Sequence, residues 1–317
     1  MKKTTVVFSL MSLLVLTSCT FTFPSLSTSS SEENESSSVS SEDSSSSSVS
    51  SSESSSLPSS SSESSSSSSP YTLVWNDEFD GTSLNESNWS YMYGDGSNYG
   101  NPGWGNGEAQ FYTKNNTRVQ NGQLIITAKA ESLGGKNYTS SRLRTAGKVY
   151  TTYGRIEASI SLPAVAGMWP AFWMLPESDT PYGGWAAGDE IDIMEAKGRI
   201  NTSTSGALHF GEVGRSTYIS NNQTFPNQTF EGFHVYAIEW EEHEIRWYVD
   251  DRLFMICSSD QWWSANSDRD TAPFDVDFHI LLNMAVGGHF DGYTLPPEGF
   301  ESAEMCVDYV RIYTLNS

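Results

Sequence analysis

The stretch GDEIDIMEAKG, residues 188–198, sets three carboxylates among Ile and Met residues between two glycines. If it is a β-strand, side-chain alternation puts Glu190 and Asp192 on one face and the two Ile residues on the other. Glu195 would then fall on the apolar face, unless a β-bulge at residues 193–194 returns it to the face of Glu190. We therefore predict a bulged strand that carries three acids in a row on one face.

An acidic row of this kind is either a solvated strand face or a catalytic site. Carboxylates that lie close together repel, and the repulsion raises the pKa of at least one of them. One protonated and one ionised carboxyl group are what hydrolysis of a glycosidic bond requires. The pattern alone leaves both interpretations open, and the surrounding sequence favours the catalytic one.

From residue 71 onward the chain consists of short alternating apolar segments separated by Gly, Asn and Asp. This pattern is typical of strands and tight turns, and the sequence has no long helical period and no internal repeat. The predicted strands include residues 123–129, 154–162, 234–240, 244–250 and 306–313, with turns at 121–122, 134–135 and 250–251. Many strands at this spacing predict an all-β, antiparallel two-sheet sandwich.

Residues 71 to about 315 resemble glycoside hydrolase family sixteen, in its bulged, laminarinase-like form. Beside EIDIME (190–195), the landmarks occur in the family's order. They are WNDEFDG (75–81), GNGEAQFYT (105–113), YGRIE (153–157), GMWPAFWML (167–175), FH (233–234), WYVD (247–250), NMAVGG (283–288) and VDYVR (307–311). The resemblance implies a concanavalin-like jelly roll, with the substrate bound across the concave sheet.

By this resemblance Glu190 is the nucleophile, Glu195 is the general acid and later the base, and Asp192 hydrogen-bonds the nucleophile. With one residue absorbed by the bulge, the two glutamates are about four strand steps, or roughly 13 Å, apart along the strand. Curvature can bring their carboxyl groups to about 5 Å, the spacing of a retaining enzyme. Asp189 faces away by parity, and we expect a structural role for it.

The same resemblance implies a set of residues that bind the glycan. Aromatic side chains would stack on sugar rings, and polar ones would bind hydroxyl groups in the negative subsites; His209 could also be only a satisfied surface group. The set is Trp185, Trp169 and Trp173 as platforms, Trp104 at the mouth of the site, Asn106 and Arg142 for hydroxyls, and His209 near the acid/base. Glu108 would support the loop of Asn106, whereas Trp75, Trp240 and Trp247 would belong to the core. HF at 289–290 replaces the Asn-Trp pair that laminarinases often show, so one positive or distal subsite is in doubt.

Catalysis needs no cofactor in this interpretation. The resemblance implies a structural calcium, held by the Asp308 carboxylate and the backbone oxygens of Glu78 and Gly122, and oxygen ligands suit this cation. The alternative is that Asp308 only caps a strand pair. Cys257 and Cys306 could form a disulfide or remain free thiols.

The composition of the first 70 residues does not predict a folded domain. Residues 1–18 have a basic start and a short apolar segment, and together with Cys19 they resemble a bacterial lipoprotein signal, with lipid on Cys19; the alternative is an ordinary signal peptide. Residues 19–70 are Ser-rich with seven acids and no Lys or Arg, which predicts a disordered linker. We expect the protein at the extracellular face of the bacterial membrane, lipid-anchored or secreted.

Removing the two lysines and seven acids of the first 70 residues from the totals of 17 basic and 39 acidic residues leaves residues 71–317 a net charge of −17. This charge argues against nucleic acid as a partner, and weakly against a sulfated polysaccharide. We predict a monomeric, retaining endo-β-glucanase that hydrolyses β-1,3-glucan of the laminarin type, or mixed-linkage β-1,3-1,4-glucan. The alternatives are a galactanase of the agarase or carrageenase type and a non-catalytic β-glucan-binding protein.

Overall fold

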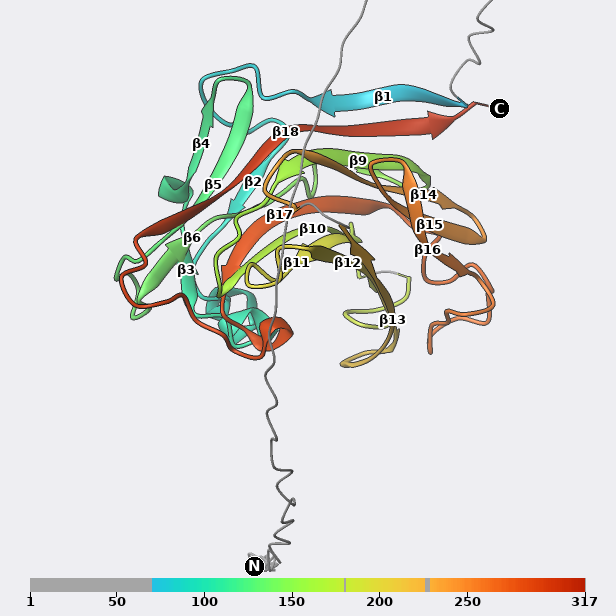
Figure 1. Cartoon of the computed structure of the whole chain (residues 1–317). Helices are drawn as coiled ribbons and strands as arrows, with labels where there is room; N and C mark the ends of the chain where they lie inside the picture. Colours follow the sequence, from blue (N-terminus) through green and yellow to red (C-terminus); the bar gives the residue numbers. More distant parts are fainter. Residues whose placement is uncertain (1–69, 180, 226–228, 317) are drawn as a thin grey trace, which may run out of the picture. The chain divides into compact units, whose positions relative to one another are not determined.

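The computed structural model describes residues 70–179, 181–225 and 229–316, which fold into a jelly roll of two β-sheets. Every strand pair in this part of the chain is antiparallel except β3 with β6. Figure 1 shows the sheet that contains β10 to β13 curving beneath the sheet that contains β9, β14 and β18. The predicted all-β sandwich is therefore confirmed.

The larger sheet has ten strands within the described residues, in the order β16-β15-β14-β9-β18-β5-β6-β3, with β1 beside β18 and β4 beside β5. Its strands are β1 (Tyr71–Asp77), β3 (Gln110–Tyr112), β4 (Thr117–Gln120), β5 (Gln123–Lys129), β6 (Tyr138–Ser140), β9 (Gly154–Ser161), β14 (His234–Glu241), β15 (Glu244–Val249), β16 (Arg252–Ser258) and β18 (Ser302–Leu315).

The other sheet has eight strands in the same described ranges, in the order β13-β12-β11-β10-β17-β7-β2, with β8 beside β17. Its strands are β2 (Ser90–Met92), β7 (Arg142–Arg144), β8 (Tyr150–Thr151), β10 (Met168–Pro176), β11 (Glu190–Ala196), β12 (Ser203–Glu212), β13 (Arg215–Thr224) and β17 (Phe278–Val286). Short 3₁₀ turns lie at η1 (Ser97–Tyr99), η2 (Pro102–Gly105), η3 (Lys114–Asn116) and η4 (His289–Asp291).

The three predicted turns are confirmed. Asn121 and Gly122, with φ of 57° and 73°, connect β4 to β5 as a two-residue hairpin loop, and this backbone is what an Asn-Gly pair favours. Asp250 and Asp251, with φ of 49° and 59°, connect β15 to β16 in the same way. Gly134 and Gly135 also have positive φ and lie inside a small β-bridge.

The core fills the space between the two sheets. It includes the fully buried side chains of Phe172, Phe278, Tyr236, Trp240 and Trp247, so the assignment of the last two to the core is confirmed. Burial of large aromatic side chains supplies much of the stability of such a sandwich. Trp75 is partly buried and packs against the same core.

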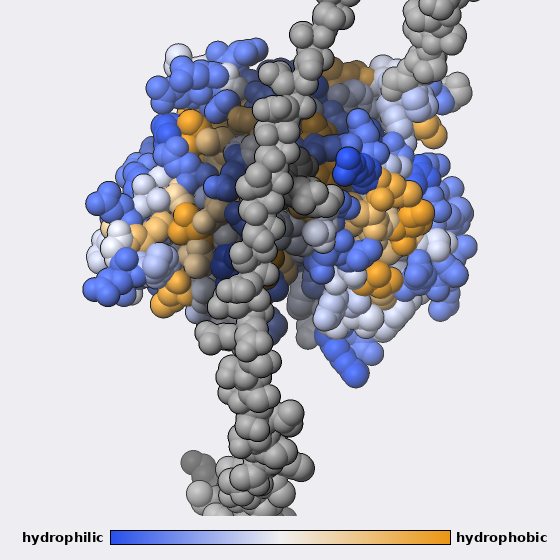
Figure 2. Space-filling model, in the orientation of Figure 1, coloured by the Kyte–Doolittle hydropathy of each residue, from blue (hydrophilic) through white to orange (hydrophobic). Residues whose placement is uncertain are grey.

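The visible face of the described domain is largely hydrophilic, with patches of hydrophobic atoms on both sides, one of them on the side where β14 to β16 lie (Figure 2). Exposed apolar side chains on β16 include Leu253 and Ile256. Cys257 and Cys306 are both free, which settles the choice that the sequence left open.

The lipoprotein signal (1–18), lipidation at Cys19 and the linker up to residue 69 lie outside the described residues and stay predictions. Within residues 70–179, 181–225 and 229–316, no helix has the length and apolar character needed to cross a membrane.

Candidate active site

The predicted bulge is present in β11. In the pairing of β11 with β12, Asp192 lies opposite Ala207 and Glu195 lies opposite Ser205. A step of three residues on β11 therefore matches a step of two on β12, which is the definition of a bulge. The extra residue turns Glu195 back to the face of Glu190 and Asp192, as the sequence predicted.

The bulge is built by packing on the core side. The consecutive residues Ile193 and Met194 both lie buried in the core, which a regular strand would not allow. Trp247 of the opposite sheet donates its indole N–H to the backbone oxygen of Asp192, at 2.9 Å. Gly206 makes room for this contact, because a Cβ there would lie 2.6 Å from the Trp247 ring. The kink is thus fixed by both sheets.

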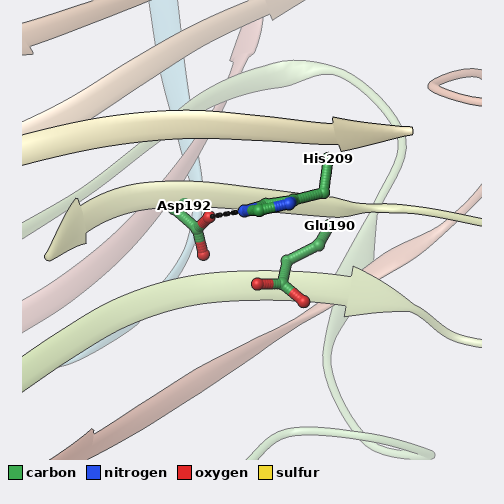
Figure 3. Close-up of side chains that lie close together, drawn as sticks. All are labelled: Glu190, Asp192 and His209. Atoms are coloured by element: carbon green, nitrogen blue, oxygen red, sulfur yellow. Dashed lines mark ion pairs between the residues drawn. The ribbon is translucent and has the colours of Figure 1, made fainter. Parts of the chain in front are cut away.

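Glu190, Asp192 and His209 lie together on the exposed side of the sheet (Figure 3). His209 on β12 is the direct cross-strand neighbour of Glu190, and its Nε2 lies 3.3 Å from Oδ2 of Asp192. Its Nδ1 lies 3.1 Å from the Ser216 hydroxyl. Both ring nitrogens therefore have polar partners, and the imidazole is held beside the acids.

Burial and mutual repulsion raise the pKa of both glutamates. Burial, followed by the charge of Asp192, raises the pKa of Glu190 to about 8. The same two causes raise the pKa of Glu195 well above its usual value, which favours the protonated form of this carboxyl group. A protonated carboxyl is what a general acid must be before the leaving oxygen takes its proton.

His209 supplies positive charge to this group. Burial alone would lower the pKa of His209, but the hydrogen bond and charge of Asp192, together with the charges of the two glutamates, raise it to about 9. Among the described residues, Glu190, Asp192 and His209 are the one set whose ligand atoms could meet a metal ion, all within 4.8 Å. A metal would need neutral His209, so the trio fits an ion cluster better than a metal centre.

Two tryptophan side chains hold the two glutamates. Trp185, about half exposed, donates its indole N–H to Oε2 of Glu190 at 3.0 Å. Trp169 on β10 donates to Oε1 of Glu195 at 2.8 Å. The Trp169 ring is nearly buried and stacks on Phe290, with centroids 5.0 Å apart. Trp185 therefore offers an open ring face, whereas Trp169 contributes mainly its hydrogen bond.

Arg142 on β7 contacts two indole rings. Its guanidinium carbon is 4.5 Å from the centroid of Trp104 and 4.7 Å from that of Trp173. Asn283 accepts the indole N–H of Trp173 at 2.8 Å. The expected position of Trp104 at the mouth of the site is wrong, because this residue is only 4% exposed and its ring packs against Arg142. Both distances are within the range of cation–π contacts, which stabilise the guanidinium group.

The loop of Asn106 is supported by Glu108, as expected. Glu108 is buried, and burial raises its pKa while its Oε2 accepts hydrogen bonds from Gln110 and Tyr112. The backbone oxygen of Asn106 accepts the amide N–H of His289 at 2.8 Å. Asn106 is thereby joined to the segment that follows β17.

Asp189 lies immediately before the catalytic strand and is buried, with 1% of its surface exposed. Within the described part of the chain neither carboxyl oxygen has a hydrogen-bond partner, and burial raises the pKa of Asp189 to about 10. Its φ is +78°, in the left-handed region that most non-glycine residues avoid. These features agree with the structural role expected from parity.

The residues implied as calcium ligands lie at one end of the larger sheet. In β18, Val310 is paired with the last residue of β1 and Val307 with the second residue of β5. Asp308 therefore lies between the chain segment that reaches Glu78 and the turn that contains Gly122.

The donor set fits a hard cation. Asp308 is exposed, whereas the Glu78 carboxylate is bound by Arg311 through two hydrogen bonds of 2.8 and 2.9 Å. The Glu78 carboxylate is thus occupied, and its backbone oxygen would be the ligand. Binding of calcium stays a prediction.

Some of the surroundings of the acids were not predicted. Ser216 and Tyr218 on β13 flank His209, with the rings of His209 and Tyr218 5.6 Å apart, and Phe290 covers Trp169. The alternation of SGALHFG (205–211) with RSTYISNN (215–222) around a Val-Gly turn was the available signal for a hairpin at this place.

Two family models match the chain. The model described as glycosyl hydrolases family 16 matches residues 105–280, which include all three acids. A model described as beta-glucan synthesis-associated protein SKN1/KRE6/Sbg1 matches residues 1–191 and so ends before Asp192 and Glu195.

Among curated relatives, the glucan endo-1,3-beta-glucosidase A1 of Niallia circulans is 42% identical over 261 residues, and the match covers 76% of this chain but only 37% of that protein. The beta-glucanase of Rhodothermus marinus is 41% identical over 258 residues, covering 77% of this chain and 85% of the relative.

The crystal structure of the laminarinase catalytic domain of Thermotoga maritima is similar at a TM-score of 0.70 and 37% identity, covering 78% of this chain and 99% of that one. The family model, the identity over most of a relative and the structural match agree with the landmarks and the bulged acidic strand. The chain belongs to the glycosyl hydrolases family 16.

Proposed function

We propose that this protein is an endo-β-glucanase that hydrolyses β-1,3 linkages, or β-1,4 linkages next to β-1,3 ones, with retention of configuration. The observation that carries the proposal is the bulge in β11, which places Glu190, Asp192 and Glu195 on one face. The similarity to a glucan endo-1,3-beta-glucosidase, a beta-glucanase and a laminarinase supports β-glucan as the substrate class.

In the first step, the Glu190 carboxylate attacks the anomeric carbon of the sugar next to the bond to be cleaved. The glycosidic bond breaks, Glu195 gives its proton to the leaving oxygen, and a covalent glycosyl ester forms on Glu190. The raised pKa of Glu195 suits this donor role. Asp192 and the His209 cation lie beside Glu190, and the positive charge favours its ionised form.

In the second step, Glu195 takes a proton from water, and the oxygen of that water attacks the anomeric carbon. The ester bond to Glu190 breaks, and the sugar is released with the configuration of the substrate. Trp185 and Trp169 hold the two carboxyl groups through their indole N–H donors, so the acids are oriented before substrate arrives.

Other side chains near the acids supply binding groups. The open ring of Trp185 would stack on the sugar adjacent to the cleaved bond, and Arg142 and Asn106 would bind hydroxyls of sugars on the non-reducing side. The Arg142 guanidinium is held rigidly by two indoles, so little entropy is lost when it binds a hydroxyl.

A substrate panel tests the proposal. The purified protein should release reducing ends from laminarin or lichenan and not from agarose or carrageenan. Glu190→Ala should still bind the glucan and lose turnover. The first product formed should have the β-configuration by NMR, and an α-product would overturn the double-displacement mechanism. Cleavage of a galactan alone would favour the galactanase, and binding without cleavage by the wild type would favour the glucan-binding protein.

For localisation, we propose a lipid anchor at Cys19 on the extracellular face of the membrane. The supporting observation is the LTSC sequence at 16–19 after an apolar segment, followed by a Ser-rich stretch of low hydrophobicity. Such an anchor would hold the protein at the membrane surface.

A further inference from the structure

β13 continues the acidic face of the sheet beyond β12. In the registers, Glu190 of β11 is opposite His209 of β12, and His209 is in turn opposite Tyr218 of β13. Direct cross-strand neighbours project from the same face of a sheet. Tyr218 therefore lies on the face of the acids, two strands away from Glu190. Figure 1 shows β13 at the end of this sheet, beside β12.

The Tyr218 ring is 64% exposed, although it is a large aromatic side chain. Its centroid lies 5.6 Å from that of His209 at an interplanar angle of 32°, and His209 lies 6.1 Å from Trp185 at 40°. The His209 ring is therefore a neighbour of both the Trp185 ring and the Tyr218 ring. An exposed aromatic ring that extends a binding face is a common feature of ligand sites.

Tyr218 lies on the opposite side of the acids from Arg142. The strand order β13-β12-β11-β10-β17-β7 puts the acids of β11 between Tyr218 on β13 and Arg142 on β7. If Arg142 binds sugars on the non-reducing side, a glycan that continues past Glu195 runs over β12 toward β13. Neighbouring strands are about 4.8 Å apart, so β13 lies about 10 Å from β11, which leaves room for sugar rings of the leaving group.

Small side chains lie between two of the acids and β13. Ser205 and Ala207 of β12, which face Glu195 and Asp192, have small side chains, and Ser220 beside Ala207 on β13 is small as well. The His209 ring lies between Glu190 and Tyr218, so a glycan that crosses from β11 to β13 would pass over this ring or over the small side chains beside it.

β13 is held firmly enough to carry a binding platform. Ten residue pairs join it to β12, from Ser203 with Thr224 to Glu212 with Arg215. On its other face Asn221 donates its side-chain amide to the backbone oxygen of Phe254 in the opposite sheet, at 2.8 Å.

We propose that Tyr218 is a sugar-binding platform for the leaving-group side of the substrate, in a positive subsite of the enzyme. The inference rests on the proposed β-glucanase function. The ring stacks on a sugar downstream of the cleaved bond, and it increases the rate for substrates that carry sugar there. A substrate whose leaving group is not a sugar gains nothing from this contact.

The test compares Tyr218→Ala with the wild type on two substrates. One is a β-1,3-gluco-oligosaccharide, and the other is the 4-nitrophenyl glycoside of a shorter β-1,3-gluco-oligosaccharide, whose leaving group is nitrophenol. We expect kcat/KM of the variant to fall about tenfold on the oligosaccharide and to stay unchanged on the nitrophenyl glycoside. Tyr218→Phe keeps the ring and should retain most of the oligosaccharide activity.

Phe233→Ala is the matched control, because Phe233 is an exposed aromatic residue that precedes β14 of the other sheet. It should leave both activities unchanged. Equal activity of Tyr218→Ala and wild type on the oligosaccharide, or an equal loss on both substrates, would overturn the assignment of Tyr218 alone. A wild type inactive on both substrates would instead overturn the proposed function, and this inference with it.

Discussion

Glu190 and His209 are direct cross-strand neighbours in β11 and β12, so an imidazolium stands beside the carboxyl group proposed as the nucleophile. The charge of His209 lowers the pKa of Glu190 and opposes the effects of burial and of Asp192. The net result is a pKa of about 8 for Glu190. His209 therefore increases the fraction of Glu190 that is ionised at a given pH.

We predict that His209→Gln moves the acidic limb of the kcat/KM profile to higher pH. The neutral side chain no longer lowers the pKa of Glu190, so the nucleophile stays protonated to a higher pH. If the limb moves by one pH unit, kcat/KM at a fixed pH on that limb falls about tenfold. The profile should be measured on laminarin between pH 4 and 10, and an unmoved acidic limb would mean that His209 does not control the charge of Glu190.

Trp169 acts on the other glutamate. Its indole N–H donates to Glu195, and this hydrogen bond lowers the pKa of Glu195. Trp169→Phe keeps a ring against Phe290 but removes the hydrogen-bond donor. The pKa of Glu195 should therefore rise, and the alkaline limb of the kcat/KM profile should move to higher pH. The acid also loses its orientation, and kcat should fall by about tenfold.

Trp173→Phe is the control for that variant. Trp173 lies on the same strand, but it donates to Asn283 and not to an acid. Its replacement should weaken substrate binding near Arg142 and leave the alkaline limb in place. If both variants shifted the limb equally, the effect would not come from the hydrogen bond to Glu195.

The catalytic strand could be predicted from the sequence because side chains alternate between the two faces of a strand. This alternation, applied to the three acids, fixes the geometry of the strand. Glu195 cannot reach the face of Glu190 without a bulge, and the bulge is at the predicted residues. The hairpin turns were predictable for a similar reason, since Asn121-Gly122 and Asp250-Asp251 tolerate the positive φ that those turns require.

The surroundings of the acids could not be predicted in the same way. In the sequence, Trp104 is one of several aromatic residues near a Gly-rich loop. Only the packing of that loop against Arg142 shows that Trp104 is buried. In the sequence, Tyr218 is a single aromatic residue in a polar strand. Only the register across three strands shows that it lies on the face of the acids. Long-range register and loop packing depend on tertiary contacts that local patterns do not encode.

Calcium should stabilise the fold without acting in catalysis. We expect the melting temperature to rise with added Ca²⁺ and to fall with a chelator, because a ligand bound only by the folded state stabilises it. Asp308→Asn should remove the calcium response and leave kcat unchanged when assayed below the melting temperature. A melting temperature that changes with neither Ca²⁺ nor chelator would favour the alternative, in which Asp308 only caps a strand pair.

The anchor can be tested independently of catalysis. In the native host, Cys19→Ala should move the protein from the membrane fraction to the medium or leave it unprocessed, because the variant lacks the sulfur that would carry lipid. The wild type should incorporate a radiolabelled fatty acid, and the variant should not. Wild-type protein found unlabelled in the medium would favour an ordinary signal peptide.

Asp189 gives a prediction about stability and pH. Its pKa of about 10 in the folded state lies far above the usual value of about 3.9 for an unfolded Asp. The unfolded state therefore loses its proton first as pH rises, and the folded state loses stability relative to it through the range between the two values. Each pH unit in that range costs up to about 1.4 kcal/mol.

Asp189→Asn should remove this cost, because the amide is neutral at every pH and Asn tolerates the φ of +78° at this position. The gain in unfolding free energy over wild type should be small near pH 5 and should grow toward pH 8, to on the order of 1 kcal/mol or more. Urea denaturation at both pH values measures it. Asp80→Asn, at an exposed position, should show no such growth. A gain that stays constant from pH 5 to pH 8 would show that Asp189 is not held protonated in the folded protein.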